Sequence, residues 1–194
     1  MKLPKDQIVE IFKETNALLE GHFVLTSGLH SPHYFQCAKV LQYPKYLHLL
    51  AGDIAKHYEY SEVELVISPA VGGIVVGTEV GRVLGARTIF AERESGSMNL
   101  RRGFEIKKGE RVLIVEDVVT TGGSVDEIIS LVNTAEAKLV GVGCIVDRSN
   151  GKIKFDAKFY SVIEMEVKTY QESEMPESLA AIPVSKPGSR NLQK

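Results

Sequence analysis

Residues 112–124 read VLIVEDVVTTGGS, and the residues that follow, VDEIISLVNT, have the apolar spacing of an amphipathic helix. The run VLIV is continuously apolar, which is typical of a strand buried on both faces of a parallel sheet. Glycines and hydroxyl side chains fill the turn between strand and helix. In open α/β sheets, ligands bind at the carboxyl ends of the strands, where this turn must lie. The stretch thus predicts a fold class and the place of a ligand site.

Further apolar runs of the same kind lie on either side, with helical spacing between them. Helices are predicted at about 74–84 and 124–135, where they supply the crossovers between parallel strands. This alternation predicts an α/β domain with two βαβ units, that is, a doubly wound, mainly parallel twisted sheet flanked by helices. The runs are Leu65–Ile67, Thr88–Ala91 and Leu139–Val146.

The chain before this core has a different pattern. Apolar residues at helical spacing predict a helix over 6–19, and Pro44 opens a second one. Short extended pieces are expected between them, at Phe23–Thr26 and Tyr34–Gln36, around a turn-rich SGLHSP.

Beyond about residue 168, Pro, Ser, Lys and Glu are frequent, which predicts a loose or peripheral tail. We expect a single domain over 1–194. Its core spans about 44–165, and a small hood at about 20–40 stands beside the N-terminal helix. The tail would occupy about 168–194.

The composition is that of an ordinary soluble globular protein. The 194 residues are 44% hydrophobic and 25% charged, and the net charge of −2 argues against nucleic-acid binding, which normally needs a basic face. Cys37 and Cys144 form no CxxC pair, so a reducing compartment is the simplest setting. The start lacks the apolar stretch of a signal peptide, and the run Leu65–Gly77 is too short to cross a bilayer. We expect a cytoplasmic protein with no membrane or nucleic-acid partner.

The turn after residue 119 has the chemistry of a phosphate site. Gly122 and Gly123 let the backbone approach an anion closely, and the helix start offers free N–H groups. The hydroxyls of Thr120, Thr121 and Ser124 add further donors. No lysine follows the glycines, so a Walker A loop is excluded.

Two adjacent acids, Glu116 and Asp117, precede this turn. They would repel a bare phosphate, but they suit sugar hydroxyls or a nearby metal ion. The combination therefore predicts a ribose phosphate as ligand. The plainer alternative is a strand–turn–helix in which Ser124 caps the helix and the acids are solvated.

A second glycine-containing turn, Ser68-Pro-Ala-Val-Gly-Gly73, also lies after a buried strand and before a helix. Its backbone amides suit a pyrophosphate. Tight packing of the turn is the alternative.

The segment Glu92–Gly103 reads ERESGSMNLRRG and connects two strands. Its polar, glycine-containing sequence predicts a mobile lid. Arg93, Arg101 and Arg102 could bind a pyrophosphate leaving group bidentately and stabilise its charge. The alternative is an ordinary solvated connection.

Asp147-Arg148 ends the apolar run at 139–146. An arginine at the carboxyl end of a sheet could bind a substrate carboxylate in a forked geometry. A salt bridge between Arg148 and Asp147 or another acid is the alternative. The five histidines show no metal-ligand spacing, so we interpret them as structural or exposed.

These motifs together resemble a known family. VLIVEDVVTTGGS is similar to the signature with which type I phosphoribosyltransferases bind phosphoribosyl pyrophosphate (PRPP), and the chain from about 5 to 165 resembles the orotate phosphoribosyltransferases. The resemblance implies the type I phosphoribosyltransferase fold. It also implies transfer of the 5-phosphoribosyl group from PRPP to orotate, giving orotidine 5′-phosphate and pyrophosphate in UMP biosynthesis. Mg²⁺ would be held mainly by PRPP, with no ligand directly from the protein. A homodimer would share the lid across its subunits.

The resemblance also implies roles for individual residues. Catalysis would involve Arg93, Arg101, Arg102 and Asp117. The residues implied to bind PRPP are Ala70, Val71, Gly72, Gly73, Glu116, Asp117, Val118, Val119, Thr120, Thr121, Gly122, Gly123 and Ser124. Those implied to bind orotate are Thr26, Tyr34, Phe35, Thr120 and Arg148.

The chain departs from the family pattern at two places. Many members have lysine at the position of Thr26, and many have an Arg-Lys pair followed by a lysine and a histidine in the lid, where Arg93 aligns with the first lysine. Other functions stay open: a phosphoribosyltransferase for a purine or another base, and a non-catalytic PRPP-sensing regulator. The hood and Arg148 argue against a purine, and the chain shows no basic helix-turn-helix pattern of the kind a regulator would add.

Overall fold

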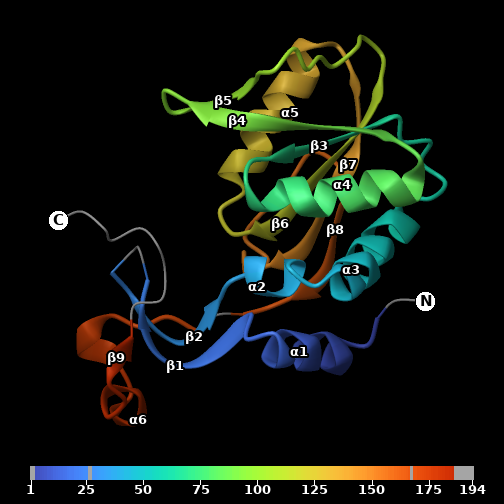
Figure 1. Ribbon diagram of the computed structural model, residues 1–194. Helices are drawn as coiled ribbons and strands as arrows, with labels where there is room; N and C mark the ends of the chain where they lie inside the picture. Colours follow the sequence, from blue (N-terminus) through green and yellow to red (C-terminus); the bar gives the residue numbers. More distant parts are fainter. Residues whose placement is uncertain (1–2, 26–27, 167, 186–194) are drawn as a thin grey trace.

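The computed structural model describes residues 3–25, 28–166 and 168–185 (Figure 1). Its centre is a six-stranded sheet in the order β5-β4-β3-β6-β7-β8. All neighbouring strands are parallel except β5, which runs antiparallel to β4 at the edge. The predicted mainly parallel α/β fold is therefore confirmed. The strands are β3 (Leu65–Pro69), β4 (Arg87–Glu94), β5 (Ser97–Leu100), β6 (Arg111–Val119), β7 (Lys138–Asp147) and β8 (Phe159–Glu164).

Helices cover both faces of the sheet, which explains the apolar run in β6. Leu113 and Val115 belong to the hydrophobic cluster that contains residues of α3 and α4. Val112 and Ile114, which alternate with them along the strand, belong to the cluster that contains residues of α5. All four side chains are fully buried. The helices are α1 (Lys5–Glu14), α2 (Ala38–Leu41), α3 (Pro44–His57), α4 (Gly72–Leu84) and α5 (Gly123–Thr134).

A second, smaller sheet forms the hood, in the order β2-β1-β9. Its strands are β1 (Leu18–Val24), β2 (His30–Phe35) and β9 (Val184–Ser185). Figure 1 shows β1 and β2 (blue) beside the tail (red), below the main sheet. No helix among the described residues is long and apolar enough to span a membrane.

The predicted first helix ends earlier than expected, at Glu14 rather than at residue 19. Asn16 has a positive φ of 53°, and the N–H of Ala17 donates to the Phe12 carbonyl, so the backbone leaves the helix there. The apolar residues Leu18 and Leu19 consequently open β1. The apolar residues keep helical spacing up to Leu19, and this spacing does not reveal the turn that ends the helix.

The tail is peripheral, but its described part is attached to the hood rather than loose. Tyr170 and His30 exchange backbone hydrogen bonds, and β9 pairs with β1 in parallel. Leu179, in the short helix α6 (Glu177–Ala180), is 5% exposed. The described part of the tail is held in place by hydrogen bonds to the hood, which is distant in sequence.

The two edge strands of the main sheet, β5 and β8, were not predicted from the sequence.

Candidate active site

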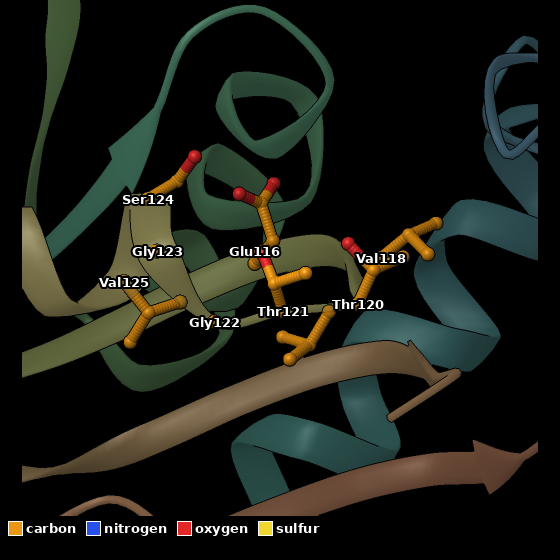
Figure 2. A pocket seen from close by; sticks show the side chains of 9 residues that line it. Glu116, Val118, Thr120, Thr121, Gly122, Gly123, Ser124 and Val125 are labelled. Carbon is orange, nitrogen blue, oxygen red and sulfur yellow. The ribbon is translucent and has the colours of Figure 1, made fainter. Parts of the chain in front are cut away.

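The turn after β6 lines a pocket at the carboxyl end of the sheet (Figure 2). Gly122 is the N-cap of α5 with a φ of 79°, a conformation that favours glycine. A Cβ at this position would also lie 3.2 Å from the Phe155 ring. Figure 2 shows the Ser124 hydroxyl and the Glu116 carboxyl pointing to the same side of the turn. The pocket is lined by Glu116, Val118, Val119, Thr120, Thr121, Gly122, Gly123, Ser124 and Val125.

The alternative in which Ser124 caps the helix is not what the structure shows. The cap position is occupied by Gly122, and among the described residues no side chain makes a capping hydrogen bond at this helix start. The first residues of α5, Gly123, Ser124 and Val125, line the pocket. Such a helix start can hold a phosphate.

The two acids before the turn are closely coupled. Glu116 is 9% exposed, and its Oε1 accepts the N–H of Asp117 at 2.9 Å. Burial, and next the neighbouring Asp117 carboxyl, raise the pKa of Glu116 well above its usual range. The Asp117 Oδ1 accepts the N–H of Val118 at 3.0 Å. A carboxyl with a raised pKa can donate as well as accept a hydrogen bond, which suits it to a sugar hydroxyl.

The structure brings the turn at 68–73 against these acids. A Cβ on Gly72 would lie 2.3 Å from Asp117 Oδ2, and one on Gly73 would lie 3.0 Å from Glu116 Oε1. The peptide bond between Ala70 and Val71 is cis, and Val71 is 80% exposed. The turn at 68–73 thus lies directly against the acids that precede the turn at 120–124.

One predicted donor of this turn is not available to a ligand. The N–H of Ala70 donates to the Ala91 carbonyl at 2.8 Å, which holds the turn on β4. The hydroxyl of Ser68, at the start of the turn, is buried and has no hydrogen-bond partner within the described ranges. Any amides of this turn that bind an anion are therefore those beyond Ala70.

Arg148 follows β7 and stands beside the end of β6, where its N–H donates to the Val119 carbonyl at 2.8 Å. Its side chain is half-buried, and burial lowers the pKa of its guanidinium. Its Nε is buried and has no hydrogen-bond partner among the described residues. Among the described residues no ion pair joins it to Asp147, whose carboxylate instead accepts the N–H of Ser149 at 2.7 Å. The salt-bridge alternative is thus not observed. A buried, unpaired N–H is costly unless a ligand satisfies it.

The hood separates two aromatic residues that were predicted to act together. Phe35 is 7% exposed and packs on Phe12, with ring centroids 4.9 Å apart, so its side chain belongs to the core. Tyr34 points to the other face of β2, and its ring centroid lies 5.7 Å from that of Phe23. Of the pair, Tyr34 alone stays a candidate for contact with a base. Thr26 lies outside the described residues.

The predicted lid is mostly a β-hairpin rather than an irregular loop. Strands β4 and β5 pair from Ala91↔Leu100 to Glu94↔Ser97, with Ser95 and Gly96 in positive-φ conformations at the turn. Each of its arginines forms an ion pair: Arg93 with Glu127, Arg101 with Glu94 and Arg102 with Glu92. In this conformation no ion pair or hydrogen bond among the described residues links these arginines to the turn at 120–124. Glu127 could not be found from the sequence pattern, because only the position of Arg93 in space reveals its role.

Comparisons with known proteins agree on one family. A model of the phosphoribosyl transferase domain matches residues 39–180. The orotate phosphoribosyltransferase of Chlorobium phaeobacteroides is 54% identical over 187 residues, which are 96% of this chain and 97% of the relative. That of a Thermoanaerobacter species is 52% identical over 190 residues, or 98% of this chain and 100% of the relative.

Solved structures share the fold at lower identity. The crystal structure of orotate phosphoribosyltransferase from Aeropyrum pernix has a TM-score of 0.70 at 23% identity, covering 81% of this chain and 93% of that one. An adenine phosphoribosyltransferase from Rhodothermus marinus has a TM-score of 0.64 at 18% identity, covering 81% of this chain and 99% of that one. Because enzymes for different bases match almost equally well, these likenesses establish the fold and not the base.

Proposed function

The chain belongs to the phosphoribosyltransferase family, and we infer that it is an enzyme that transfers the 5-phosphoribosyl group of PRPP to orotate. The products are orotidine 5′-phosphate and pyrophosphate, and the reaction is a step of pyrimidine biosynthesis. Near-full-length relatives at more than half identity support the choice of orotate. The structural observation that carries it is the half-buried Arg148, whose Nε has no hydrogen-bond partner in the part of the chain that the structure describes.

PRPP binds where the two glycine-containing turns meet. The 5′-phosphate takes the amides and hydroxyls at the start of α5, and the ribose hydroxyls take Glu116 and Asp117. The pyrophosphate lies along Gly72 and Gly73. The closeness of Gly72 to Asp117 supports this arrangement. A side chain on the Gly72 Cα would push Asp117 away and so separate the pyrophosphate site from the ribose site.

The base binds between Arg148 and the hood. Orotate carries a carboxylate that uracil, adenine and hypoxanthine lack, and a guanidinium can bind a carboxylate with two parallel hydrogen bonds. Thr120, which directly follows β6, and Tyr34 complete the base site.

The reaction is displacement at the anomeric carbon. A ring nitrogen of orotate gives up its proton to solvent and forms the new bond to this carbon, while the bond to pyrophosphate breaks and its electron pair leaves with the pyrophosphate. The transition state resembles an oxocarbenium ion, as in other glycosyl transfers. The protein contributes by positioning both substrates and by stabilising the charge on the leaving group. Arg101 is the hairpin arginine most easily released for that role, because its ion pair with Glu94 is long, at 3.5 Å.

We expect Mg²⁺ as cofactor, held mainly by PRPP. Hard cations prefer oxygen ligands, and the carboxyl oxygens of Asp117 and Glu116 adjoin the proposed pyrophosphate turn. Among the described residues no three His, Cys, Asp or Glu side chains are grouped to hold a metal by themselves, so the substrate would supply most ligands. When bound, the ion neutralises negative charge on the pyrophosphate.

The enzyme is further proposed to work in the cytoplasm as a homodimer in which the β4–β5 hairpin reaches the partner subunit's site. This arrangement is compatible with the hairpin arginines, none of which, among the described residues, bonds to the turn at 120–124 of its own chain. Size measurement in solution, and activity from mixing two differently inactivated variants, would test it. A fully active monomer would contradict it.

The function is tested by incubating the full-length protein with PRPP and Mg²⁺ and one of orotate, uracil, hypoxanthine or adenine. We expect turnover with orotate alone, measured as the release of pyrophosphate. Turnover with a purine and none with orotate would replace the assignment. Binding of PRPP without turnover of any base would favour a PRPP-sensing regulator.

A further inference from the structure

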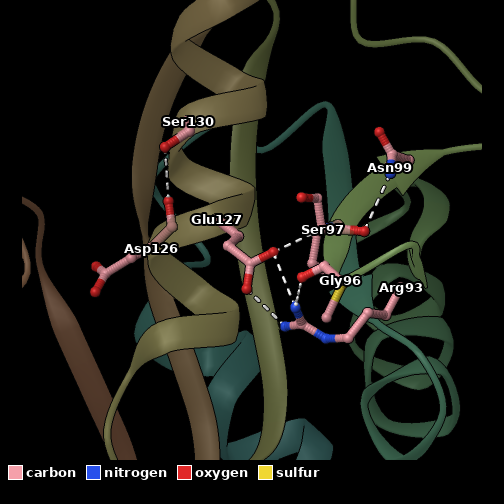
Figure 3. Close-up of polar contacts among 8 residues, drawn as sticks. Arg93, Gly96, Ser97, Asn99, Asp126, Glu127 and Ser130 are labelled. Carbon is pink, nitrogen blue, oxygen red and sulfur yellow. Dashed lines mark hydrogen bonds and ion pairs between the residues drawn. The ribbon is translucent and has the colours of Figure 1, made fainter.

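The tip of the β4–β5 hairpin is tied to α5 by one ion pair (Figure 3). The Arg93 guanidinium meets the Glu127 carboxylate with both terminal nitrogens, at 2.6 Å and 3.2 Å. The same guanidinium donates to the Gly96 carbonyl at the hairpin turn. Arg93 is therefore occupied on two sides, by its own hairpin and by the helix.

Glu127 also binds the other strand of the hairpin. Its Oε2 accepts the N–H of Met98 at 2.7 Å. Because β5 is the edge strand of the sheet, the amides on its outer side have no neighbouring strand to pair with. One carboxylate thus joins a side chain of β4 and the backbone of β5 to a single point on α5. Hydrogen bonds from Arg93 and then from Met98 lower the pKa of Glu127, so it stays charged.

The anchor point lies close to the phosphate turn. Glu127 is four residues after Gly123 and three after Ser124, and residues at these spacings share one face of a helix. The helix end that holds the 5′-phosphate in the proposed function is therefore the one that holds the hairpin.

We propose that Arg93 and Glu127 form a latch that positions the β4–β5 hairpin on α5, and that both are positioning residues rather than groups that touch the pyrophosphate. The kinetic part of this inference rests on the proposed function. It separates the three lid arginines, which the sequence could not rank. Arg93 holds the hairpin, whereas Arg101, with its single long contact to Glu94, is left to act on the leaving group.

The latch predicts the same defect from either partner. Arg93→Ala and Glu127→Gln should each lower kcat about tenfold, because misplacement of a catalytic element by about 1 Å can cost up to 10²-fold. The double variant should be no worse than either single one, since both remove one interaction. If Arg93 instead acted on the pyrophosphate, Glu127→Gln would free it and leave kcat unchanged or higher.

A second measurement does not depend on turnover. Hydrogen exchange at the Met98 amide of the full-length protein should be slow in the wild type and at least about tenfold faster in Glu127→Gln and in Arg93→Ala. Asp126→Asn is the matched control. It removes a charge from the neighbouring residue of α5, whose side chain points away from the hairpin in Figure 3, and should leave Met98 exchange unchanged.

The two measurements give distinct outcomes. Unchanged Met98 exchange in Glu127→Gln, or losses in kcat that add in the double variant, would overturn the latch. A wild-type protein without orotate turnover would overturn the proposed function instead, while the exchange measurement would still decide whether the latch exists.

Discussion

The turn at 120–124 and the β4–β5 hairpin serve the same proposed substrate, but they are held in different ways. The turn is fixed by its immediate neighbours: β6 ends before it, Gly122 caps α5, and the acids bond to adjacent amides. The hairpin is fixed by ion pairs, one of which reaches 34 residues along the chain. Exposed ion pairs are weak and easily exchanged, whereas a buried strand with its helix is not. A preformed turn suits binding, and an exchangeable hairpin suits a group needed only during reaction.

The sharpest way to test this division is Arg101→Ala. If the hairpin acts in the transition state, kcat should fall about 10²- to 10³-fold, the usual cost of removing one stabilising donor. The KM for PRPP should change little, because the turn still binds it. Steady-state kinetics with PRPP and orotate measure both constants, and Arg101→Lys shows whether charge alone restores the rate. A raised KM with normal kcat would assign Arg101 to ground-state binding.

Among small changes next to the turn at 120–124, Gly72→Ala should lower activity most, because Gly72 faces Asp117. The new Cβ would lie 2.3 Å from Asp117 Oδ2, so Asp117 must move. We expect kcat/KM for PRPP to fall about 10²-fold, because positioned groups tolerate little displacement. Gly52→Ala, in α3 with open space around the glycine, is the matched control and should keep full activity. Equal activity of the two variants would mean that Asp117 does not contact the substrate.

Arg148→Ala separates the base site from both regions. Its loss should raise the KM for orotate about 10- to 100-fold, as expected for one charged hydrogen-bonding group, with little change for PRPP. Arg87→Ala is the control, because Arg87 opens β4 at the opposite end of the sheet and pairs with Glu110 at 2.8 Å. An unchanged KM for orotate would place the carboxylate elsewhere.

The same contrast explains how far the sequence could go. The strands β3, β6 and β7, their crossover helices and the turn at 120–124 follow from local apolar patterns and glycines, and the structure contains them. Residues in contact over long sequence distances could not be derived in this way. The pairing of β9 with β1 and the contact of Glu127 with Arg93 depend on how distant segments meet.

Single positions show the same limit. Tyr34 and Phe35 are adjacent aromatic residues, and the sequence alone does not distinguish them. Because side chains alternate along a strand, Tyr34 points away from the core while Phe35 is buried against Phe12. Ala70 belongs to a glycine-containing turn that suits an anion, yet its amide is used by β4. The sequence pattern therefore indicates where a site lies, and the packing of the folded chain decides which side chains and amides remain available to a ligand.

The smallest expected effect concerns the cost of keeping the turn ready for a ligand. Because burial and Asp117 raise the pKa of Glu116, the folded chain holds this proton to a higher pH than the unfolded chain does. Its stabilising contribution is therefore complete below the ordinary carboxyl pKa and is lost as the pH rises toward the raised value. The Glu116→Gln side chain does not ionise, so the variant should not lose stability in this pH range.

Thermal unfolding at several pH values tests this expectation. The variant and the wild type should have the same Tm near pH 4, and the variant's Tm should be a few degrees higher at pH 8, about 2–4 °C per kcal/mol for a chain of this size. PRPP binding should weaken in the same variant, so the substitution would raise stability at pH 8 and lower function. A Tm that stayed equal at both pH values would show that the carboxyl is not strained by its surroundings, and the turn would then owe its preformed shape to the backbone alone.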